Sequence, residues 1–263
     1  MIKIKILIPV FNDWKSLSKL LENISSKIIT SDKSIGIIII DDGSNEEMEK
    51  FSNDLKNIET IKILHLKNNV GHARSIATGL KYIYENDDFD YVIPMDADGE
   101  DRPVEINNFL DLIDKNSNKT IIGERVRRSE NIFFKFSYFA HKLLTYTFTG
   151  HSIKFGNYTC LPKDTVKKMI NTKSTWSSFS GSLSKIENQF VKSPSIRGLR
   201  YFGPSKMSFF NLIKHSLSII AVFKFNVLIR SLLFYLVYFY IISRNINYIT
   251  VIPIVLLTIM LIS

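Results

Sequence analysis

The first 124 residues alternate short apolar runs with segments in which apolar residues recur at helical spacing. Residues 35–40 form an isoleucine-rich run, which is typical of a strand covered on both faces in a parallel sheet. Strands that alternate with helices in this way favour a three-layer α/β sheet. We expect strands at residues 2–10, 35–40, 60–66, 91–95 and 120–123, and helices at 14–29, 46–55, 71–84 and 104–113.

The pattern beyond residue 125 is looser. We expect an amphipathic helix at residues 133–149, a short strand at 154–161 and a helix at 163–170. Residues 207–225 mix Phe, Leu and Ile with scattered lysines, which favours an interfacial helix lying on a membrane. A second core helix is the alternative for this segment.

Two strongly apolar runs follow, at residues 226–243 and 248–263. Each is close to the roughly 17–25 residues that a helix needs to cross a bilayer. Buried core helices are the alternative, but the sequence offers no evident partner that would bury two adjacent runs. We therefore expect a transmembrane helical hairpin. Because both runs are short for a bilayer, they also suggest that helices from several subunits pack together in a homo-oligomer.

Basic residues flank the first apolar run unequally. Lys206, Lys214, Lys224 and Arg230 lie before it or in its first turns, whereas the connector to the second run offers Arg244. The positive-inside rule then predicts a multi-pass protein of the cell (inner) membrane, with the preceding part of the chain in the cytoplasm.

Charge is distributed unevenly along the chain, whose net charge is +9. The first 124 residues carry 15 Lys and Arg against 22 Asp and Glu, and the remainder carries 19 against 3. A basic half can serve nucleic acid or an anionic membrane surface. Here it runs directly into apolar spans, which argues against nucleic acid as a partner. The single cysteine, Cys160, excludes an internal disulfide framework.

Acidic residues follow three of the expected strands at the point where each strand ends. These are Asn12-Asp13, Asp41-Asp42-Gly43-Ser44 and Asp96-Ala97-Asp98. Ligands of open α/β sheets bind outside the carboxyl ends of the strands. We therefore expect these side chains to converge on one binding site.

Asp96 and Asp98 are the candidate metal ligands. Two hard oxygen ligands two residues apart, with Glu100 and Asp101 just beyond, suit Mg²⁺ or Mn²⁺. A diphosphate group would complete the coordination shell, and the metal would stabilise charge on a leaving group. The alternative is a solvated turn.

The segment of Asp41 and Asp42 is the candidate nucleoside site. A carboxylate here can accept hydrogen bonds from a base N–H or a ribose hydroxyl. The alternative is a helix N-terminus capped by Ser44, with Glu47 completing a capping box.

Taken together, these motifs resemble family 2 glycosyltransferases of the GT-A fold, the Rossmann-like three-layer sheet of nucleotide-diphospho-sugar transferases. The resemblance covers roughly residues 3–225 and is greatest for the enzymes that make polyprenyl-phosphate sugars. It rests on Ile8-Pro9-Val10-Phe11-Asn12-Asp13, Asp41-Asp42-Gly43-Ser44, Asn69-Val70-Gly71 with Gly79, Met95-Asp96-Ala97-Asp98 and Gly203-Pro204-Ser205-Lys206-Met207.

The resemblance implies a role for each matching position. The nucleoside and donor would be held by Pro9, Phe11, Asp13, Asp41, Asp42 and Ala97, and the metal by Asp96, Asp98 and Glu100. The phosphates would be held by Arg125, Arg128, Arg200 and Lys206, with Arg125 acting in catalysis beside Asp96 and Asp98. A solvated charge run is the alternative for the arginines at 125–128. The implied domains are a GT-A catalytic domain at residues 1–205, an amphipathic juxtamembrane helix at 206–225 and transmembrane helices at 226–263.

The implied activity is an inverting transfer of a sugar from a UDP- or GDP-linked donor to a polyprenyl (undecaprenyl or dolichyl) phosphate. Such an acceptor is already an anion, so it needs cationic contacts rather than a strong general base. The second hypothesis is transfer to a glycan or lipid hydroxyl in cell-surface polysaccharide synthesis, with Glu187 as the base. A third is a membrane-tethered nucleotide-binding scaffold without turnover. Gly156-Asn157-Tyr158 departs from the Gly-Asp-Phe that many relatives carry, so acceptor specificity does not transfer directly.

Overall fold

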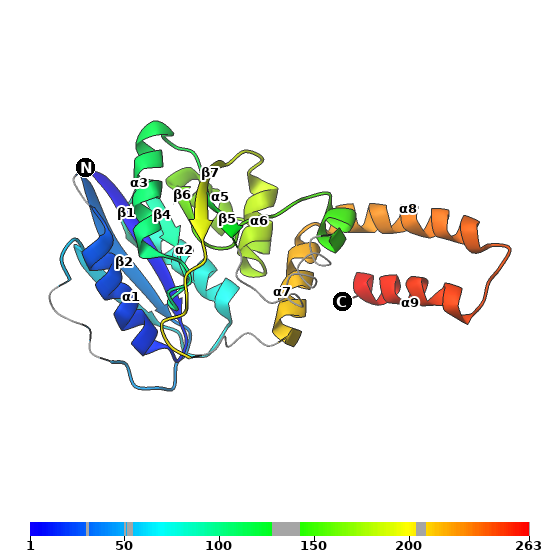
Figure 1. The fold of residues 1–263 in the computed structure, drawn as a ribbon, viewed down its shortest axis with the longest axis horizontal. Helices are drawn as coiled ribbons and strands as arrows, with labels where there is room; N and C mark the ends of the chain where they lie inside the picture. Colours follow the sequence, from blue (N-terminus) through cyan, green and yellow to red (C-terminus); the bar gives the residue numbers. More distant parts are fainter. Residues whose placement is uncertain (30–31, 50, 52–54, 128–142, 204–208, 263) are drawn as a thin grey trace. The chain divides into compact units, whose positions relative to one another are not determined.

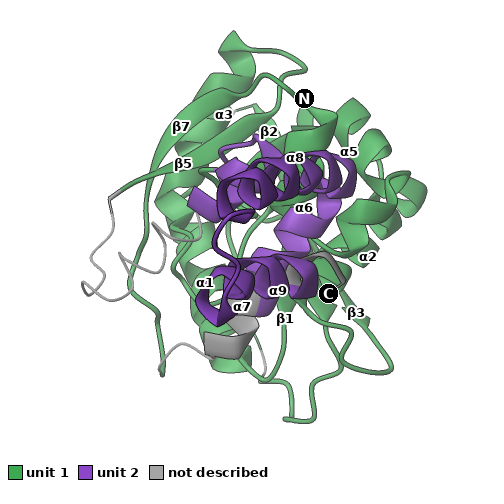
Figure 2. Cartoon of the chain, turned by 90° about the vertical axis from the view of Figure 1, so that its right-hand side faces the viewer, with its two compact units in different colours: residues 1–129, 154–206 green, residues 130–153, 207–263 purple. Residues whose placement is uncertain are grey.

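The computed structural model describes residues 1–29, 32–49, 51, 55–127, 143–203 and 209–262. The chain divides into two compact units, shown in different colours in Figure 2. The first comprises Met1–Ser129 and Lys154–Lys206, and the second comprises Glu130–Ile153 and Met207–Ser263.

The first unit is built on a seven-stranded mixed sheet with the strand order β3-β2-β1-β4-β6-β5-β7 (Figure 1). The strands are β1 (Ile2–Val10), β2 (Lys33–Asp41), β3 (Thr60–His65), β4 (Tyr91–Pro94), β5 (Ile121–Arg127), β6 (Thr159–Pro162) and β7 (Val191–Ile196). β1 to β4 are mutually parallel, and β6 pairs antiparallel with both β4 and β5. The carboxyl ends of β1 to β4 therefore meet at one edge of the sheet, as the sequence predicts.

Helices cover both faces of this sheet. They are α1 (Trp14–Lys27), α2 (His72–Asn86), α3 (Ile106–Lys115), α5 (Lys163–Ile170) and α6 (Phe179–Ile186), with the short 3₁₀ turns η1 (Pro103–Glu105) and η2 (Lys173–Trp176). Side chains of α1 and α3 share one core with Ile4, Ile6 and Ile8 of β1. α2 packs on the other face, where a Cβ at Gly79 would lie 2.3 Å from Leu7 Cδ1. The three-layer α/β architecture is confirmed.

One expected helix, at residues 46–55, is wrong for the part of it that the structure describes. Contacts from the loop after β1 and from the first residue of α1 hold that backbone in another conformation. The Asn12 side chain accepts hydrogen bonds from the N–H groups of Asn45 and Glu46, and Trp14 Nε1 donates to the Glu46 carbonyl. The capping-box alternative for Ser44 falls with that helix, because Ser44 Oγ instead accepts from Asn12 N–H.

The second unit contains α7 (Phe209–Val222), α8 (Lys224–Ile242) and α9 (Tyr248–Ile262), and residues 143–149 are also helical. α8 and α9 are joined by hydrogen bonds across the pair: Tyr238 Oη donates to the Thr250 carbonyl at 2.9 Å, and Tyr235 Oη lies 2.7 Å from Thr258 Oγ1. Within the described residues, α8 is the one helix that is long and apolar enough to cross a membrane. Of the helix expected at residues 133–149, the structure shows residues 143–149, and the earlier part lies outside the described residues.

Candidate functional site

The loop after β4 gathers the acidic side chains of the site. Asp96 N–H donates to Asp101 Oδ2 at 3.0 Å, and Glu100 N–H donates to Asp98 Oδ1 at 2.9 Å. Gly99 lies in the turn that both hydrogen bonds close, and its φ of +88° is a left-handed conformation that glycine adopts readily. The loop therefore curls back on itself and holds three aspartates close together.

This concentration of negative charge is electrostatically unfavourable. Burial, followed by the charge of Asp96, raises the pKa of Asp98 to about 6. Burial and Asp96 likewise raise the pKa of Asp101 well above its usual range. Carboxylates with these properties gain stability from a nearby cation, so the donor set fits a divalent metal ion.

Two arginines from the segment after β7 meet the same loop. Arg200 donates from Nη1 to Asp98 Oδ2 at 2.5 Å and from Nη2 to Asp13 Oδ2 at 3.2 Å. Arg197 forms a two-pronged ion pair with the Glu100 carboxylate. Arg200 thereby links the loop after β1 to the loop after β4, as their shared edge predicts.

The backbone of residues 197–201 lies along the acidic loop. Gly198 N–H donates to the Glu100 carbonyl at 2.8 Å, and Tyr201 N–H donates to the Asp98 carbonyl at 2.9 Å. The Tyr201 ring covers Gly99, where a Cβ would come within 2.5 Å of it, and its hydroxyl accepts from Asn23 Nδ2. We call residues 197–201 the arginine strap.

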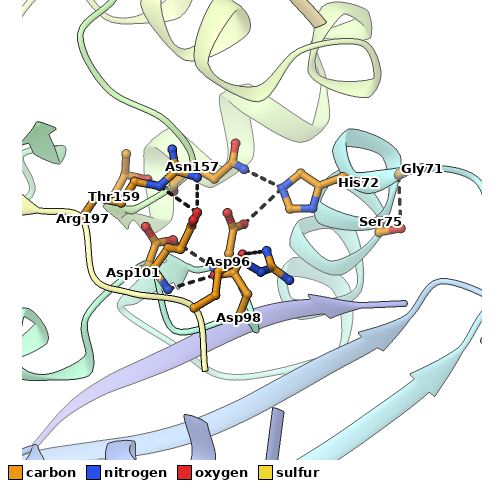
Figure 3. Close-up of polar contacts among 11 residues, drawn as sticks. Gly71, His72, Ser75, Asp96, Asp98, Asp101, Asn157, Thr159 and Arg197 are labelled. Atoms are coloured by element: carbon orange, nitrogen blue, oxygen red, sulfur yellow. Dashed lines mark hydrogen bonds and ion pairs between the residues drawn. The ribbon is translucent and has the colours of Figure 1, made fainter. Parts of the chain in front are cut away.

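His72 is a further side chain that contacts the acidic loop, at Asp96. It is the first residue of α2, and its Nε2 lies 3.3 Å from Asp96 Oδ1 and 2.6 Å from Asn157 Nδ2. Figure 3 shows the imidazole with a contact to each of these side chains. Asp96 Oδ1 is buried and has no hydrogen-bond partner in the described part of the protein.

The candidate nucleoside residues lie at the ends of β1 and β2. Asp41 Oδ2 contacts His65 Nδ1 at 2.8 Å, and its Oδ1 accepts from Ser44 N–H at 2.9 Å. Although burial opposes it, hydrogen bonding by Ser44 and His65 lowers the pKa of Asp41. Asp42 accepts from the N–H groups of Val70 and Gly71, at 2.7 and 3.0 Å.

The remaining predicted residues are placed as follows. Pro9 is buried within β1, Ala97 is buried in the acidic loop, and Phe11 is exposed. Arg125 lies in β5, where a Cβ at Gly156 would lie 3.1 Å from its guanidinium. Its charge acts to lower the pKa of Asp101, against the larger effect of burial. Arg128 and Lys206 lie outside the described residues.

The structure thus groups Asp13, Asp98 and Arg200, with Asp96 next to Asp98. Asp41 and Asp42, which the sequence also expects at this site, are held by residues 44, 65, 70 and 71. Among the residues that the structure describes, no three His, Cys, Asp or Glu side chains surround a common point closely enough to enclose a metal by themselves. Glu100 is engaged by Arg197. Sequence reasoning missed His72, Arg197 and the contact that Asn157 makes. The position of His72 directly after Gly71, at the start of the helix next to the acidic loop, is the signal that could have identified it.

Comparison with known proteins adds the family. Residues 5–179 match the model of glycosyl transferase family 2. Among relatives, the undecaprenyl-phosphate 4-deoxy-4-formamido-L-arabinose transferase of Klebsiella pneumoniae (strain 342) is 27% identical over 219 residues, covering 80% of this chain and 64% of that protein. The enzyme of the same name from Salmonella choleraesuis is 28% identical over 220 residues with the same coverage. This chain therefore spans less than two thirds of their length.

Solved structures show the same fold at low sequence identity. Glucosyl-3-phosphoglycerate synthase from Mycobacterium tuberculosis, in complex with Mn²⁺, UDP-glucose and phosphoglyceric acid, matches with a TM-score of 0.57 and 12% identity. The match covers 86% of this chain and 79% of that one. The likeness supports a GT-A-like α/β fold.

Proposed function

This chain belongs to glycosyl transferase family 2, and on that premise we propose that it transfers a sugar from a nucleotide-diphosphate donor to a polyprenyl phosphate. The observation that carries this proposal is that Asp13 and Asp98 converge on the Arg200 guanidinium at the carboxyl edge of the sheet, with Asp96 close enough to Asp98 for its charge to raise the pKa of Asp98. Such a site offers both acidic ligands for a metal and cationic groups for phosphate within one cluster. The formamido-arabinose transferases named above carry undecaprenyl phosphate in their names, which supports the choice of acceptor.

Asp96 and Asp98 would hold Mg²⁺ or Mn²⁺, and the ion would offset charge on the departing nucleoside diphosphate. Asp41 and Asp42 lie beside this cluster at the end of β2 and would accept hydrogen bonds from the nucleoside. Arg200 already contacts Asp98, so a phosphate group entering the cluster exchanges one anionic partner of the guanidinium for another.

A phosphate acceptor suits the residues around the acidic loop. Arg125 and Arg200 are cations that can hold an anion near the sugar, which makes catalysis mainly a matter of positioning and electrostatics. Glu187, the base of the hydroxyl-acceptor hypothesis, accepts hydrogen bonds from Thr165 and Lys168. The Asn157 side chain is an amide, so it cannot act as the general base that a hydroxyl acceptor needs.

The second unit supports a membrane location. The candidate span in α8 is 17% buried, whereas the core helix of a soluble protein is mostly buried. Large apolar side chains of α8 and α9 are exposed, among them Leu236, Ile241 and Ile249. We infer that α8 and α9 insert into the cell membrane and keep the catalytic unit in the cytoplasm, next to a lipid-linked acceptor.

The test is a transfer assay on the detergent-purified chain. It is incubated with Mg²⁺ or Mn²⁺, undecaprenyl phosphate and separate UDP- and GDP-sugars, and glycosylated lipid is measured. We expect a metal-dependent product that is lost in Asp98→Asn. The matched control is Asp88→Asn, an exposed aspartate that pairs with Lys3, and it should keep full activity. Donor binding with transfer only to hydroxyl acceptors would refute the acceptor assignment, and absence of donor binding would support the scaffold hypothesis.

A further inference from the structure

His72 is engaged by two side chains at one nitrogen atom. Its Nε2 lies 2.6 Å from Asn157 Nδ2 and 3.3 Å from Asp96 Oδ1. The Asn157 amide nitrogen can only donate, so Nε2 must present its lone pair to that contact. The same atom then has no proton to donate to Asp96.

The partner atom on Asp96 is unusual for the same reason. Asp96 Oδ1 is buried, and within the described residues it accepts no hydrogen bond. The single lone pair of Nε2 is used by Asn157, so no proton lies between Nε2 and Asp96 Oδ1. A buried carboxylate oxygen left without a donor is costly unless another group supplies positive charge.

A divalent cation supplies that charge. Adjacent ligands of an octahedral ion with metal–ligand distances of about 2.1 Å lie about 3.0 Å apart, close to the separation of these two atoms. We propose that His72 Nε2 and Asp96 Oδ1 bind the same divalent ion, with the Nε2 lone pair exchanging the Asn157 N–H for the metal, so that His72 is a metal ligand. This inference rests on the proposed metal at the acidic loop. It adds His72 to the ligands of that ion, whereas the carboxylate of Glu100, another expected ligand, is paired with Arg197.

A nitrogen ligand changes which ions the site prefers. Mg²⁺ strongly prefers oxygen ligands, whereas imidazole nitrogen suits first-row transition metals. The wild-type chain therefore binds Mn²⁺ or Co²⁺ more tightly than Mg²⁺. Removing the imidazole reduces the ratio of these affinities.

His65 provides a matched control because it also forms an imidazole–carboxylate pair at this edge. Its Nδ1 lies 2.8 Å from Asp41 Oδ2, a distance suited to an ordinary hydrogen bond. Both oxygens of Asp41 have partners, since Oδ1 accepts from Ser44 N–H. His65→Gln should leave metal binding unchanged.

The experiment is Mn²⁺ titration of the full detergent-solubilised chain without donor, followed by electron paramagnetic resonance and by electron spin echo modulation from ¹⁴N. We expect nitrogen modulation in the wild type and in His65→Gln, and its loss in His72→Gln and His72→Ala. The two His72 variants should bind Mn²⁺ at least about tenfold more weakly, since removing even an outer-shell partner costs that much. The half-exposed position of His72 means that both variants should fold.

Asp96→Asn separates this inference from the proposed function. If Asp96→Asn weakens Mn²⁺ binding while both His72 variants bind as the wild type does and nitrogen modulation is absent, the assignment of His72 is wrong and the metal site at the acidic loop stands. If Mn²⁺ binding is absent in the wild type or independent of Asp96, both the assignment and the metal role in the proposed function are wrong.

Discussion

Replacing Asp98 by Asn should stabilise the metal-free protein at neutral pH. Burial and the charge of Asp96 raise the pKa of Asp98 from 3.8 to about 6, and its side chain is only 15% exposed. Asn has nearly the same shape, can still accept from Glu100 N–H, and does not ionise. The substitution therefore removes the cost of holding this carboxylate ionised next to its neighbours. Its N–H₂ group replaces the oxygen that accepts from Arg200, so the loss of that contact offsets part of the gain.

The magnitude follows from the pKa difference. About two units correspond to roughly 3 kcal/mol. Because the folded protein binds this proton more tightly than the unfolded chain does, the contribution to stability is fully present below about pH 3.8 and is lost as the pH rises to about 6. At pH 7.5 the variant should gain up to ~3 kcal/mol, or about 6–12 °C in midpoint, and the gain should vanish near pH 4.

The assay is thermal unfolding across this pH range in a chelator, followed by tryptophan fluorescence, to which the buried Trp14 contributes. Mn²⁺ at 1,000 times the dissociation constant should then reverse the order, because the wild type gains about 4.1 kcal/mol while the variant binds weakly. The reasoning is refuted if Asp98→Asn is no more stable than the wild type at pH 7.5, or if its stability changes with pH as steeply as that of the wild type.

Two further substitutions test the loops around the site. Asp42→Asn places an N–H₂ group against one of the two backbone N–H groups that the carboxylate binds, so it should cost about 1.5–3 kcal/mol of unfolding free energy in urea denaturation; a change below 0.5 kcal/mol would contradict this. Gly99→Ala should cost about 1–3 kcal/mol and raise the donor KM, because φ is +88° and the new Cβ overlaps the Tyr201 ring. Gly203→Ala, at φ +65° with nothing within 4 Å of the Cβ, is its control: it should show the backbone cost but an unchanged donor KM.

Sequence periodicity predicted the parallel part of the sheet well. The apolar runs of β1, β2 and β4 are buried on both faces, so their composition alone identifies them. Because parallel strands end at one edge, the acidic residues that follow them could be predicted to converge, and Arg200 does join Asp13 to Asp98.

The strand β7 could not be predicted in this way. Its sequence is VKSPSI, in which the buried positions are the serines Ser193 and Ser195 rather than apolar residues. Ser195 Oγ donates to the buried Glu105, and Ile196 N–H donates to the same carboxylate. The position of this strand depends on a polar contact between residues that are far apart in sequence.

The metal-binding role proposed for His72 was missed for a similar reason. A single histidine at the start of a helix carries no local pattern, and Asn157 lies 85 residues away along the chain. Residues 46–55 show the opposite error, in which a local pattern predicted a helix that the described residues do not form. Hydrogen bonds with Asn12 and Trp14, which are distant in sequence, hold the described backbone there in another conformation.

The hydrogen bonds from Val70 and Gly71 to Asp42 have a consequence for how the specificity of this enzyme can evolve. These two peptide groups directly precede His72, so the carboxylate at the end of β2 fixes where the imidazole stands. On the roles proposed for Asp42 and His72, a mutation that adapts the site to another base also shifts the imidazole beside Asp96. The proposal therefore predicts that nucleotide choice and ion choice are coupled, and that variants selected for a new nucleotide should be screened in several metals.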